Sequence, residues 1–443
     1  AALMPSYIIR SMRKMFSHCL KLSYKDTAQQ NSYVTIPRAA NSFDNTEIAA
    51  NVDEDIIDSL TGGRLVGSVT SFENFAECPL RYYLRYGVDL KEREEFTFSP
   101  VNFGVVLHAV IREVCDEIKK NGESYYLISE EKRREMVKRS VSAITDIYQN
   151  SILKDSSRNS FMIKRMEDLA DRTVWAMGEQ LKCGDFVPFV FEHKFNMEVG
   201  NGDRKQLMSG TIDRVDICEN GTDVYVRIID YKTGKKDFNI VKTYYGIDIQ
   251  LMVYMEAAMK LVAKMRPGKN VLPAGVFYYN ISDPIVSATT ESAEEIEDKI
   301  KGELRLKGMV NSDKDIAEKM DNNEGTSLNI PVSRKADGGF DSRRSKVMNT
   351  EQFNMLGRFV DVRAVDTADR IAGGDIRRSP YKDGQFSSCD RCPYGAVCGF
   401  SVDLPGCNYR KLKKFDDEVL WNNIKEGVDE NGKKMDTGAE ERD

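Results

Sequence analysis

Histidine and tryptophan are scarce in this chain, and long apolar runs are missing from it. The 443 residues include 3 His and 2 Trp. No stretch approaches the roughly 18 apolar residues of a membrane-spanning helix, and charged residues interrupt the segment from Met4 to Tyr24, so it lacks the apolar core of a secretory signal. With 41% hydrophobic and 30% charged residues, the composition excludes a disordered chain and a membrane protein. We expect a cytoplasmic globular protein.

An excess of positive charge and a phosphate-binding loop are also missing. The net charge of −6 argues against a general nucleic-acid coat, because Lys and Arg supply most affinity for phosphate. The tail from Lys414 to Asp443 holds ten acidic and five basic residues, so the rest is close to neutral. No GxxxxGK[S/T] motif occurs, which excludes an ATPase of that type. Nine cysteines, an odd number, favour reduced thiols or metal ligation over disulfides.

Apolar periodicity predicts an α/β organisation. Residues 1–65 form a lead-in, 66–410 the main domain with an insertion at 285–350, and 411–443 a charged tail. Helices are predicted from Ser71, as N-cap, to Arg85, along the apolar stripe from Phe103 to Val114, twice within 130–182, and over 247–263 and 351–371. Strands are predicted over 189–199, 207–217, 224–232 and 275–279. Asn220-Gly221 is a tight-turn signal, so the second and third strands should form an antiparallel hairpin.

Carboxylates and a lysine gather at the end of this hairpin. Asp230 and Lys232 are two apart on one strand and therefore share a face, and Asp213 lies on the adjacent strand. Hard oxygen ligands of this kind suit Mg²⁺ or Mn²⁺. A nearby lysine can orient a water or stabilise charge on a phosphorane. The simpler alternative is a surface salt bridge, but charges at the end of an apolar strand are costly unless paired or metal-bound.

Other polar residues are candidates for the same site. Glu192 precedes the hairpin on its own strand, and His108 lies beside the apolar stripe of its helix. Gln250 and Tyr254 are four apart and share a helix face. Each residue alone has a structural interpretation: a satisfied histidine, a helix edge or a core aromatic. Only their joint order in the sequence is informative.

A second constellation consists of cysteines. Cys389-x2-Cys392-x5-Cys398 supplies three thiolate ligands, and spacing alone does not separate zinc from iron–sulfur. The fourth ligand is either Cys407, the plainer choice from spacing, or the distant Cys78. The remaining thiols, Cys19, Cys115, Cys183 and Cys218, are predicted to be ordinary buried residues.

The combined order of these motifs resembles the RecB-like branch of the PD-(D/E)XK nucleases. The motifs that carry the resemblance are Ser71-Phe-Glu-Asn-Phe-Ala-Glu-Cys-Pro79, Phe103-Gly-Val-Val-Leu-His108, Gly210-Thr-Ile-Asp-Arg214, Asp230-Tyr-Lys-Thr-Gly234 and Gln250-Leu-Met-Val-Tyr254. It covers roughly residues 66–410 and is closest to the nuclease domains of AddB-type components of bacterial helicase–nucleases. The resemblance implies a restriction-endonuclease-like core, with a mixed sheet flanked by helices and an iron–sulfur clasp.

The resemblance also implies roles for individual residues. His108, Asp213, Asp230 and the carbonyl of Tyr231 would bind Mg²⁺ or Mn²⁺. Lys232 would be the catalytic lysine, with Glu192, Gln250 and Tyr254 as further active-site positions. A 4Fe–4S cluster would be held by Cys78, Cys389, Cys392 and Cys398, which favours Cys78 over Cys407. Phosphate contacts are predicted for Arg81, Arg85, Arg214 and Lys235.

The function predicted in this way is metal-dependent hydrolysis of DNA, as an exonuclease on a single strand in double-strand break repair. The partners would be DNA and an AddA-type helicase–nuclease chain, with no membrane. Residues 1–65 are then the end of a helicase-like region, unless the chain is a stand-alone family member. Three alternative functions are considered. A CRISPR-associated RecB-like exonuclease is disfavoured by the long separation of Cys78 from Cys389. The other two are a non-catalytic DNA-binding scaffold held by zinc or iron–sulfur, and an iron–sulfur redox enzyme.

Overall fold

The computed structural model describes Val52 and residues 66–91, 100–147, 157–200, 206–287, 290–404 and 406–440. These residues fall into two compact units, which we describe separately. The smaller unit includes Val52, residues 77–91 and the stretch 371–411, and the larger unit includes 66–76, 100–370 and 412–440. Apart from Val52, the predicted lead-in of residues 1–65 lies outside the described residues.

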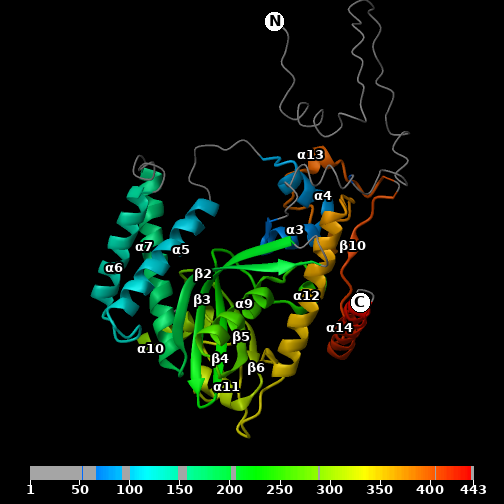
Figure 1. The fold of residues 1–443 in the computed structure, drawn as a ribbon. Coiled ribbons are helices and arrows are strands. Elements are labelled where there is room, and N and C mark those ends of the chain that lie inside the picture. The colour runs from blue at the N-terminus through cyan, green and yellow to red at the C-terminus, as the bar shows by residue number, and fades with distance from the viewer. Residues whose placement is uncertain are drawn as a thin grey trace, which may run out of the picture. The chain divides into compact units, whose positions relative to one another are not determined.

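The larger unit is built on one mixed β-sheet, which confirms the predicted α/β class (Figure 1). Its strands are β1 (Val66–Ser68), β2 (Val187–Val199), β3 (Gln206–Asn220), β4 (Asp223–Lys232), β5 (Asn270–Asn280), β6 (Lys307–Asn311) and β7 (Val347–Met348). They follow the order β1-β3-β4-β5-β6-β7, and β2 pairs with β3 outside this path. The pairs β2–β3, β3–β4 and β5–β6 are antiparallel, whereas β1–β3, β4–β5 and β6–β7 are parallel.

The predicted hairpin of β3 and β4 is confirmed, and it determines where Asp213 lies. The two strands pair from Arg214 opposite Ile229 to Asn220 opposite Asp223. Gly221 turns the chain with a φ of 60°, a conformation that glycine adopts without steric cost. The short strand β1 pairs with β3 only over residues 207–209. Because β2 occupies the other edge of β3, Asp213 falls in the gap between β1 and β4.

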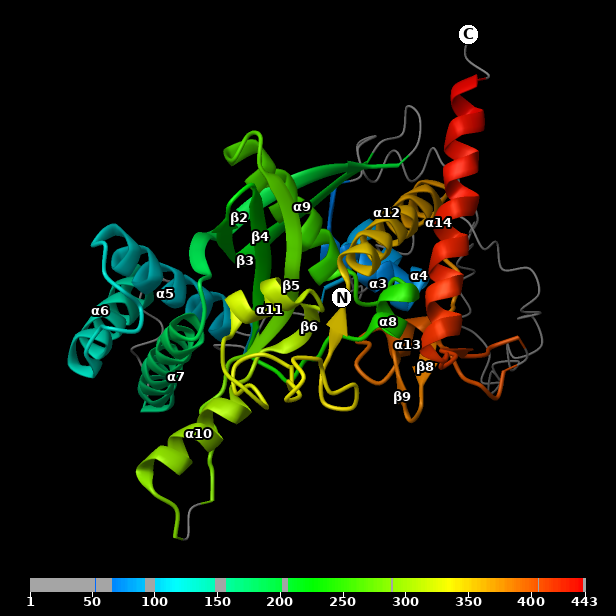
Figure 2. The same cartoon turned by 90° about the horizontal axis from the view of Figure 1, so that it is seen from below.

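Helices cover both faces of the sheet (Figures 1 and 2). One face carries α5 (Pro100–Lys120), α6 (Glu130–Ile147) and α7 (Ser157–Lys182), and the other carries α9 (Gln250–Met265), α12 (Thr350–Ala372) and α14 (Asp417–Glu440). Successive strand residues alternate between the two cores, so Ile229 packs with the first set and Ile228 with the second. A sheet covered on both faces explains the nearly continuous apolar sequence of β4.

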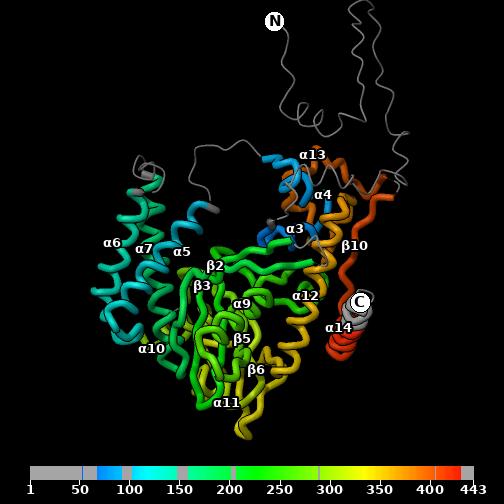
Figure 3. The backbone as a smooth tube through the Cα atoms, viewed as in Figure 1, coloured from blue at the N-terminus to red at the C-terminus, as the bar shows by residue number. Residues whose placement is uncertain are grey.

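The predicted helices of residues 100–182 are confirmed. The apolar stripe of α5 is fully buried, from Phe103 through Leu107 to Val114. Figure 3 traces α5, α6 and α7 side by side before the chain enters β2. The shorter helices of this unit are α8 (Ile240–Tyr244), α10 (Ala293–Glu303) and α11 (Lys314–Met320). No helix within the described ranges is both long and apolar enough to cross a membrane.

The single helix predicted from Ser71 to Arg85 is wrong. α3 (Val69–Glu77) ends before Cys78, which is extended with φ −167° and ψ 117°, and α4 (Pro79–Tyr82) begins immediately after it. Proline disfavours helical geometry in the residue before it, which explains the break. Ser71 lies inside α3 rather than at its cap, and its backbone N–H donates to Ser68 Oγ at 3.2 Å.

Two other segments contribute more to the larger unit than their sequences indicated. Residues 285–350 supply β6 and β7, which extend the main sheet beyond β5. The charged tail contains the amphipathic helix α14, whose Leu420 and Ile424 are buried in the core with Phe359 of α12. The charged residues of this helix from Asp417 to Glu430 are exposed, so they occupy the outer face of a packed helix.

The smaller unit contains the cysteine motif. After α4 comes a π-helical turn, η2 (Tyr83–Gly87), and the later segment holds β8 (Tyr381–Asp383), β9 (Phe386–Ser387), α13 (Gly395–Cys398) and β10 (Arg410–Lys411). Its three strands follow the order β10-β8-β9. Backbone and side-chain hydrogen bonds join the two segments, with Leu80 N donating to Arg377 O at 3.3 Å and Tyr394 Oη donating to Leu90 O at 2.9 Å.

A buried charge cluster lies beside the active-site strands of the larger unit. Arg214 Nε and Nη2 donate to Asp216 at 2.7 and 2.6 Å, and Arg227 Nε donates to the same carboxylate at 2.9 Å. All three side chains are at most 1% exposed. Burial would raise the pKa of Asp216, but the two guanidinium groups lower it by more. Asp216 is thus the counter-ion of Arg214 and Arg227, whose burial without a negative partner would be costly.

Removing that carboxylate should destabilise the larger unit strongly. We expect Asp216→Ala to lower the free energy of unfolding by about 3–5 kcal/mol, because two buried guanidinium groups lose their counter-ion. Urea denaturation followed by circular dichroism measures this change. The control is Glu219→Ala on the same strand, which breaks an ion pair with Arg266 at the surface and should change stability little. Equal unfolding midpoints for the two variants would contradict the assignment.

Candidate active site

The two central strands bring the predicted carboxylates together. Asp213 lies on β3, and Asp230 and Lys232 lie at the end of β4. Asp213 Oδ2 accepts a hydrogen bond of 2.6 Å from Tyr231 N, so a side chain links the strands just where their regular pairing ends. Both aspartates are buried, at 7% and 2% exposure. The prediction that these residues converge is confirmed by the geometry.

His108 and Glu192 complete a compact group with Asp213. His108 Nδ1 lies 3.3 Å from Asp213 Oδ1 and 3.8 Å from Glu192 Oε1. Within the described residues, these three form the one group of three or more His, Cys, Asp or Glu ligand atoms that all lie within 4.8 Å of one another. Ligands on opposite sides of a Mg²⁺ ion are separated by roughly 4 Å, so this spacing fits a small divalent cation.

Glu192 has an unusual backbone for a strand residue. Its φ is 48°, in the left-handed region, and the β2–β3 register passes from Phe191 opposite Arg214 to His193 opposite Ile212. A non-glycine residue in this region costs about 1–3 kcal/mol and persists where the surroundings enforce it. The irregularity at Glu192 occurs directly opposite Asp213, and its carboxylate is the one that approaches His108.

Lys232 is held by a second group of side chains. Its Nζ lies 2.5 Å from Asp230 Oδ2 and donates to Gln250 Oε1 at 3.0 Å. The amide nitrogen of Gln250 donates to Asp230 Oδ1 at 3.1 Å and to Tyr254 Oη at 3.0 Å. The shared helix face predicted for Gln250 and Tyr254 therefore contacts the β4 residues. The side-chain amide of Gln250 therefore holds both Asp230 and Lys232 in place.

The pKa values of the acids reflect burial and mutual repulsion. Burial raises the pKa of Asp230 to about 6, with a further increase from Asp213 that Lys232 only partly offsets. Burial and the charge of Asp213 likewise raise the pKa of Glu192. Burial lowers the pKa of His108, but the hydrogen bond and charge of Asp213 raise it by more. The three carboxylates of Glu192, Asp213 and Asp230 carry more negative charge than Lys232 and His108 can neutralise.

The donor set fits a divalent metal ion. Asp230 is buried and already has a cation beside it, because Lys232 Nζ lies 2.5 Å from Oδ2. The close group of His108, Glu192 and Asp213 sets two carboxylates against one imidazole, and a cation between them would offset the repulsion of the carboxylates. Carboxylate oxygens and an imidazole are ligands that Mn²⁺ accepts, and carboxylates with water suit Mg²⁺. His108, Glu192 and Asp213 are the residues whose ligand atoms lie close enough together to hold the ion.

Two neighbours shape the walls of the site. The Tyr231 ring contacts the His108 ring edge-on, with centroids 5.9 Å apart, and thereby fixes the imidazole. Gly210, in the predicted Gly210–Arg214 motif, leaves room for two rings: a Cβ there would lie 2.6 Å from Phe195 and 2.9 Å from Tyr254. The glycine is therefore needed for close approach of Tyr254.

The four cations predicted to contact phosphate differ in exposure. Arg214 is buried against Asp216, so it is not available to a ligand and that prediction is wrong. The burial of Arg214 could not be predicted from the sequence. Its partner, Asp216, lies two residues along the same strand, and this spacing of opposite charges is also common on protein surfaces. Arg85 and Lys235 are exposed. Arg81 is partly buried in an ion pair with Glu77.

The smaller unit contains the cysteines of the predicted cluster. Burial raises the pKa values of Cys78, Cys389 and Cys398, and each of these also interacts electrostatically with Cys392. Cys407, the alternative fourth ligand, is also buried.

Sequence reasoning missed four residues around the start of α9. Glu73 Oε1 accepts from Ile249 N and Gln250 N at 2.9 and 3.0 Å. Asp248 Oδ1 accepts from Lys236 Nζ at 3.0 Å and from Tyr278 Oη at 2.6 Å. Burial, partly offset by Lys236, raises the pKa of Glu73 to about 7. The sequence did contain one signal, because Glu73 lies in the motif that carries Cys78. Nothing in the sequence showed that Glu73 contacts the start of α9.

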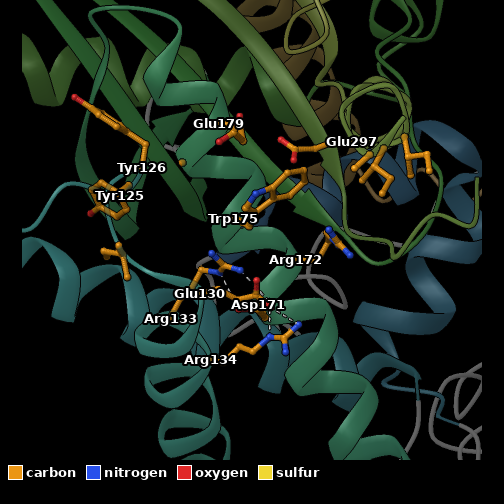
Figure 4. Close-up of a pocket in the computed structure, with 15 residues that line it drawn as sticks. Tyr125, Tyr126, Glu130, Arg133, Arg134, Asp171, Arg172, Trp175, Glu179 and Glu297 are labelled. Carbon is orange, nitrogen blue, oxygen red and sulfur yellow. Dashed lines mark hydrogen bonds and ion pairs between the residues drawn. The ribbon is translucent and has the colours of Figure 1, made fainter. Parts of the chain in front are cut away.

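A cavity of about 500 Å³ lies away from this chemistry, among α6, α7 and α10 (Figure 4). Its charged residues pair with one another, with Arg133 Nε donating to Asp171 Oδ1 at 2.7 Å and the Arg172 guanidinium 5.2 Å from the Trp175 ring centre. None of the lining residues belongs to the carboxylate group. This cavity is therefore separate from the candidate active site.

Comparison with known proteins agrees with this geometry. A family model described as the PD-(D/E)XK nuclease superfamily matches residues 67–399. The chain is 33% identical over 380 residues to an ATP-dependent helicase/deoxyribonuclease component of Thermoanaerobacter sp. (strain X514), covering 83% of this chain and 33% of the relative. It is 34% identical over 399 residues to the corresponding component of Lachnoclostridium phytofermentans, covering 88% and 34%. The chain thus spans about a third of the length of these relatives. The chain belongs to the PD-(D/E)XK nuclease superfamily.

Proposed function

We propose that this chain is the nuclease portion of an AddAB-type helicase–nuclease and hydrolyses phosphodiester bonds in DNA with Mg²⁺ or Mn²⁺. The observation that carries the proposal is the convergence of Asp213, Asp230 and Lys232 beside His108 and Glu192. The relatives are named as components of an ATP-dependent helicase/deoxyribonuclease, which supports DNA as substrate and a second protein as partner. Exonuclease action on a single strand, in the cytoplasm and in double-strand break repair, is part of the same proposal.

Each residue then has a task that follows from its position. A bound metal ion would lower the pKa of a water and stabilise charge on the leaving oxygen. His108, Glu192, Asp213 and Asp230 would hold the ion, and the carbonyl of Tyr231 is proposed to join them. Lys232 would orient the attacking water and stabilise charge that develops on the phosphoryl oxygens, because Gln250 holds its Nζ at 3.0 Å. Arg85 and Lys235, being exposed, remain proposed phosphate contacts.

We also propose that Cys78, Cys389, Cys392 and Cys398 hold a 4Fe–4S cluster that clasps the two segments of the smaller unit. The clasp joins parts far apart in sequence, so its role is structural, by limiting the unfolded chain.

The catalytic assignment is tested by Lys232→Ala on labelled single-stranded DNA with Mg²⁺. We expect cleavage to fall by about 10²–10³-fold, because charge stabilisation at the reacting phosphate is lost. Lys194→Ala, which removes an exposed lysine on β2, is the matched control and should cut like wild type. Equal cleavage by the Lys232 variant and wild type would contradict the assignment. Absence of cleavage by both, even with the helicase–nuclease partner added, would favour a non-catalytic scaffold.

The clasp is tested by the visible spectrum and metal content of the purified protein. Wild type should be brown with bound iron and sulfide, and Cys392→Ser should lose the colour and unfold at a lower temperature. Cys407→Ser should keep both, because Cys407 is outside the proposed ligand set. A colourless wild type with stoichiometric zinc would overturn the iron–sulfur proposal, and loss of colour in Cys407→Ser would overturn the ligand set.

A further inference from the structure

Helix α9 presents Gln250 to the active site, but its first turn has no local cap. The N-cap residue is Ile249, whose apolar side chain cannot accept a hydrogen bond from the free backbone N–H groups of that turn. Helices usually solve this problem with Ser, Thr, Asp or Asn at the N-cap. The start of α9 needs an acceptor from elsewhere in the chain.

Glu73 supplies that acceptor from α3, 176 residues before Ile249. One carboxylate oxygen, Oε1, accepts from Ile249 N at 2.9 Å and from Gln250 N at 3.0 Å. The side chain is 9% exposed, so water does not readily replace it. The position of the first turn of α9 is thereby tied to α3.

That turn determines where Lys232 lies. Gln250 accepts from Lys232 Nζ through Oε1 and donates to Asp230 Oδ1 through Nε2, so the backbone of Gln250 carries the bridge between the two. A shift of the backbone moves both contacts together. Catalysis is sensitive to such shifts, since a displacement of about 1 Å at a reacting group can cost roughly 10²-fold in rate.

We infer that Glu73 is a positioning residue for the nuclease reaction, acting through the first turn of α9 and Gln250 to place Lys232 against Asp230. Glu73 does not belong to the close group of His108, Glu192 and Asp213, and it accepts its hydrogen bonds from the backbone at the start of α9. The inference rests on the proposed function of the site, and it assigns to the motif before Cys78 a role beyond the clasp.

The test compares three variants of the 443-residue chain. Glu73→Ala removes the acceptor, and Glu73→Gln keeps an amide oxygen that can accept both N–H groups. Asp313→Ala is the matched control, because Asp313 Oδ1 accepts from Asp315 N and Ile316 N at 2.9 and 3.3 Å in the first turn of α11. The measurements are kcat and KM for labelled single-stranded DNA with Mg²⁺, and hydrogen exchange at the amides of residues 249 and 250.

We expect Glu73→Ala to lower kcat by about 10–10²-fold while KM changes less than about threefold. Glu73→Gln should recover most of the rate, and Asp313→Ala should cut like wild type. The amides of Ile249 and Gln250 should exchange faster in Glu73→Ala only. In combination with Gln250→Ala, Glu73→Ala should add almost no further loss, because both act on one unit.

Three results would overturn the inference: a normal rate in Glu73→Ala, an equal loss in Asp313→Ala, or losses that multiply in the double variant. Each of these leaves the proposed function intact if Lys232→Ala still abolishes cleavage. If cleavage does not depend on Lys232, the proposed function fails and the inference with it. Unchanged exchange at residues 249 and 250 in Glu73→Ala would refute the capping contact whatever the activity.

Discussion

The constraint on which this structure depends is the repulsion of carboxylates gathered at the end of two paired strands. Glu192, Asp213 and Asp230 meet in a largely buried space with one lysine and one histidine. Burial and mutual repulsion raise the pKa values of Glu192 and Asp230, so the fold holds these groups at a cost. Surrounding contacts, from Tyr231 N to the Gln250 amide, keep them in place. A divalent cation bound there would relieve this repulsion, and Lys232 would then lie beside it to meet a phosphate.

The chemistry of the site could be predicted because it is encoded in local patterns. Strand alternation places Asp230 and Lys232 on one face, and the Asn220-Gly221 turn places Asp213 opposite them. The four-residue spacing of Gln250 and Tyr254 predicts that they share a helix face, and Gln250 Nε2 donates to Tyr254 Oη. The position of His108 was harder to predict, because helix spacing gives the face on which it lies but not the residues that it contacts. The order of motifs along the chain, more than any single residue, indicated that it lies near Asp213.

What could not be predicted depends on tertiary contacts or on the conformation of one residue. Arg214 pairs with Asp216 inside the core, although the same two residues on a surface would be free to meet phosphate. Pro79 breaks the helix at Cys78, although the apolar stripe continues past this cysteine in the sequence. The left-handed backbone of Glu192 and the capping of α9 by Glu73 join segments whose spacing carries no periodic signal.

The central claim is that His108, Glu192, Asp213 and Asp230 together bind the catalytic divalent cation. Anomalous diffraction from crystals of this chain grown with Mn²⁺ tests it most directly. We expect a single strong peak at the carboxylate group that contains His108, Glu192 and Asp213, and its loss in His108→Ala but not in His193→Ala. A protein that cleaves DNA with Mn²⁺ but shows the peak elsewhere, or retains it in His108→Ala, would contradict the claim.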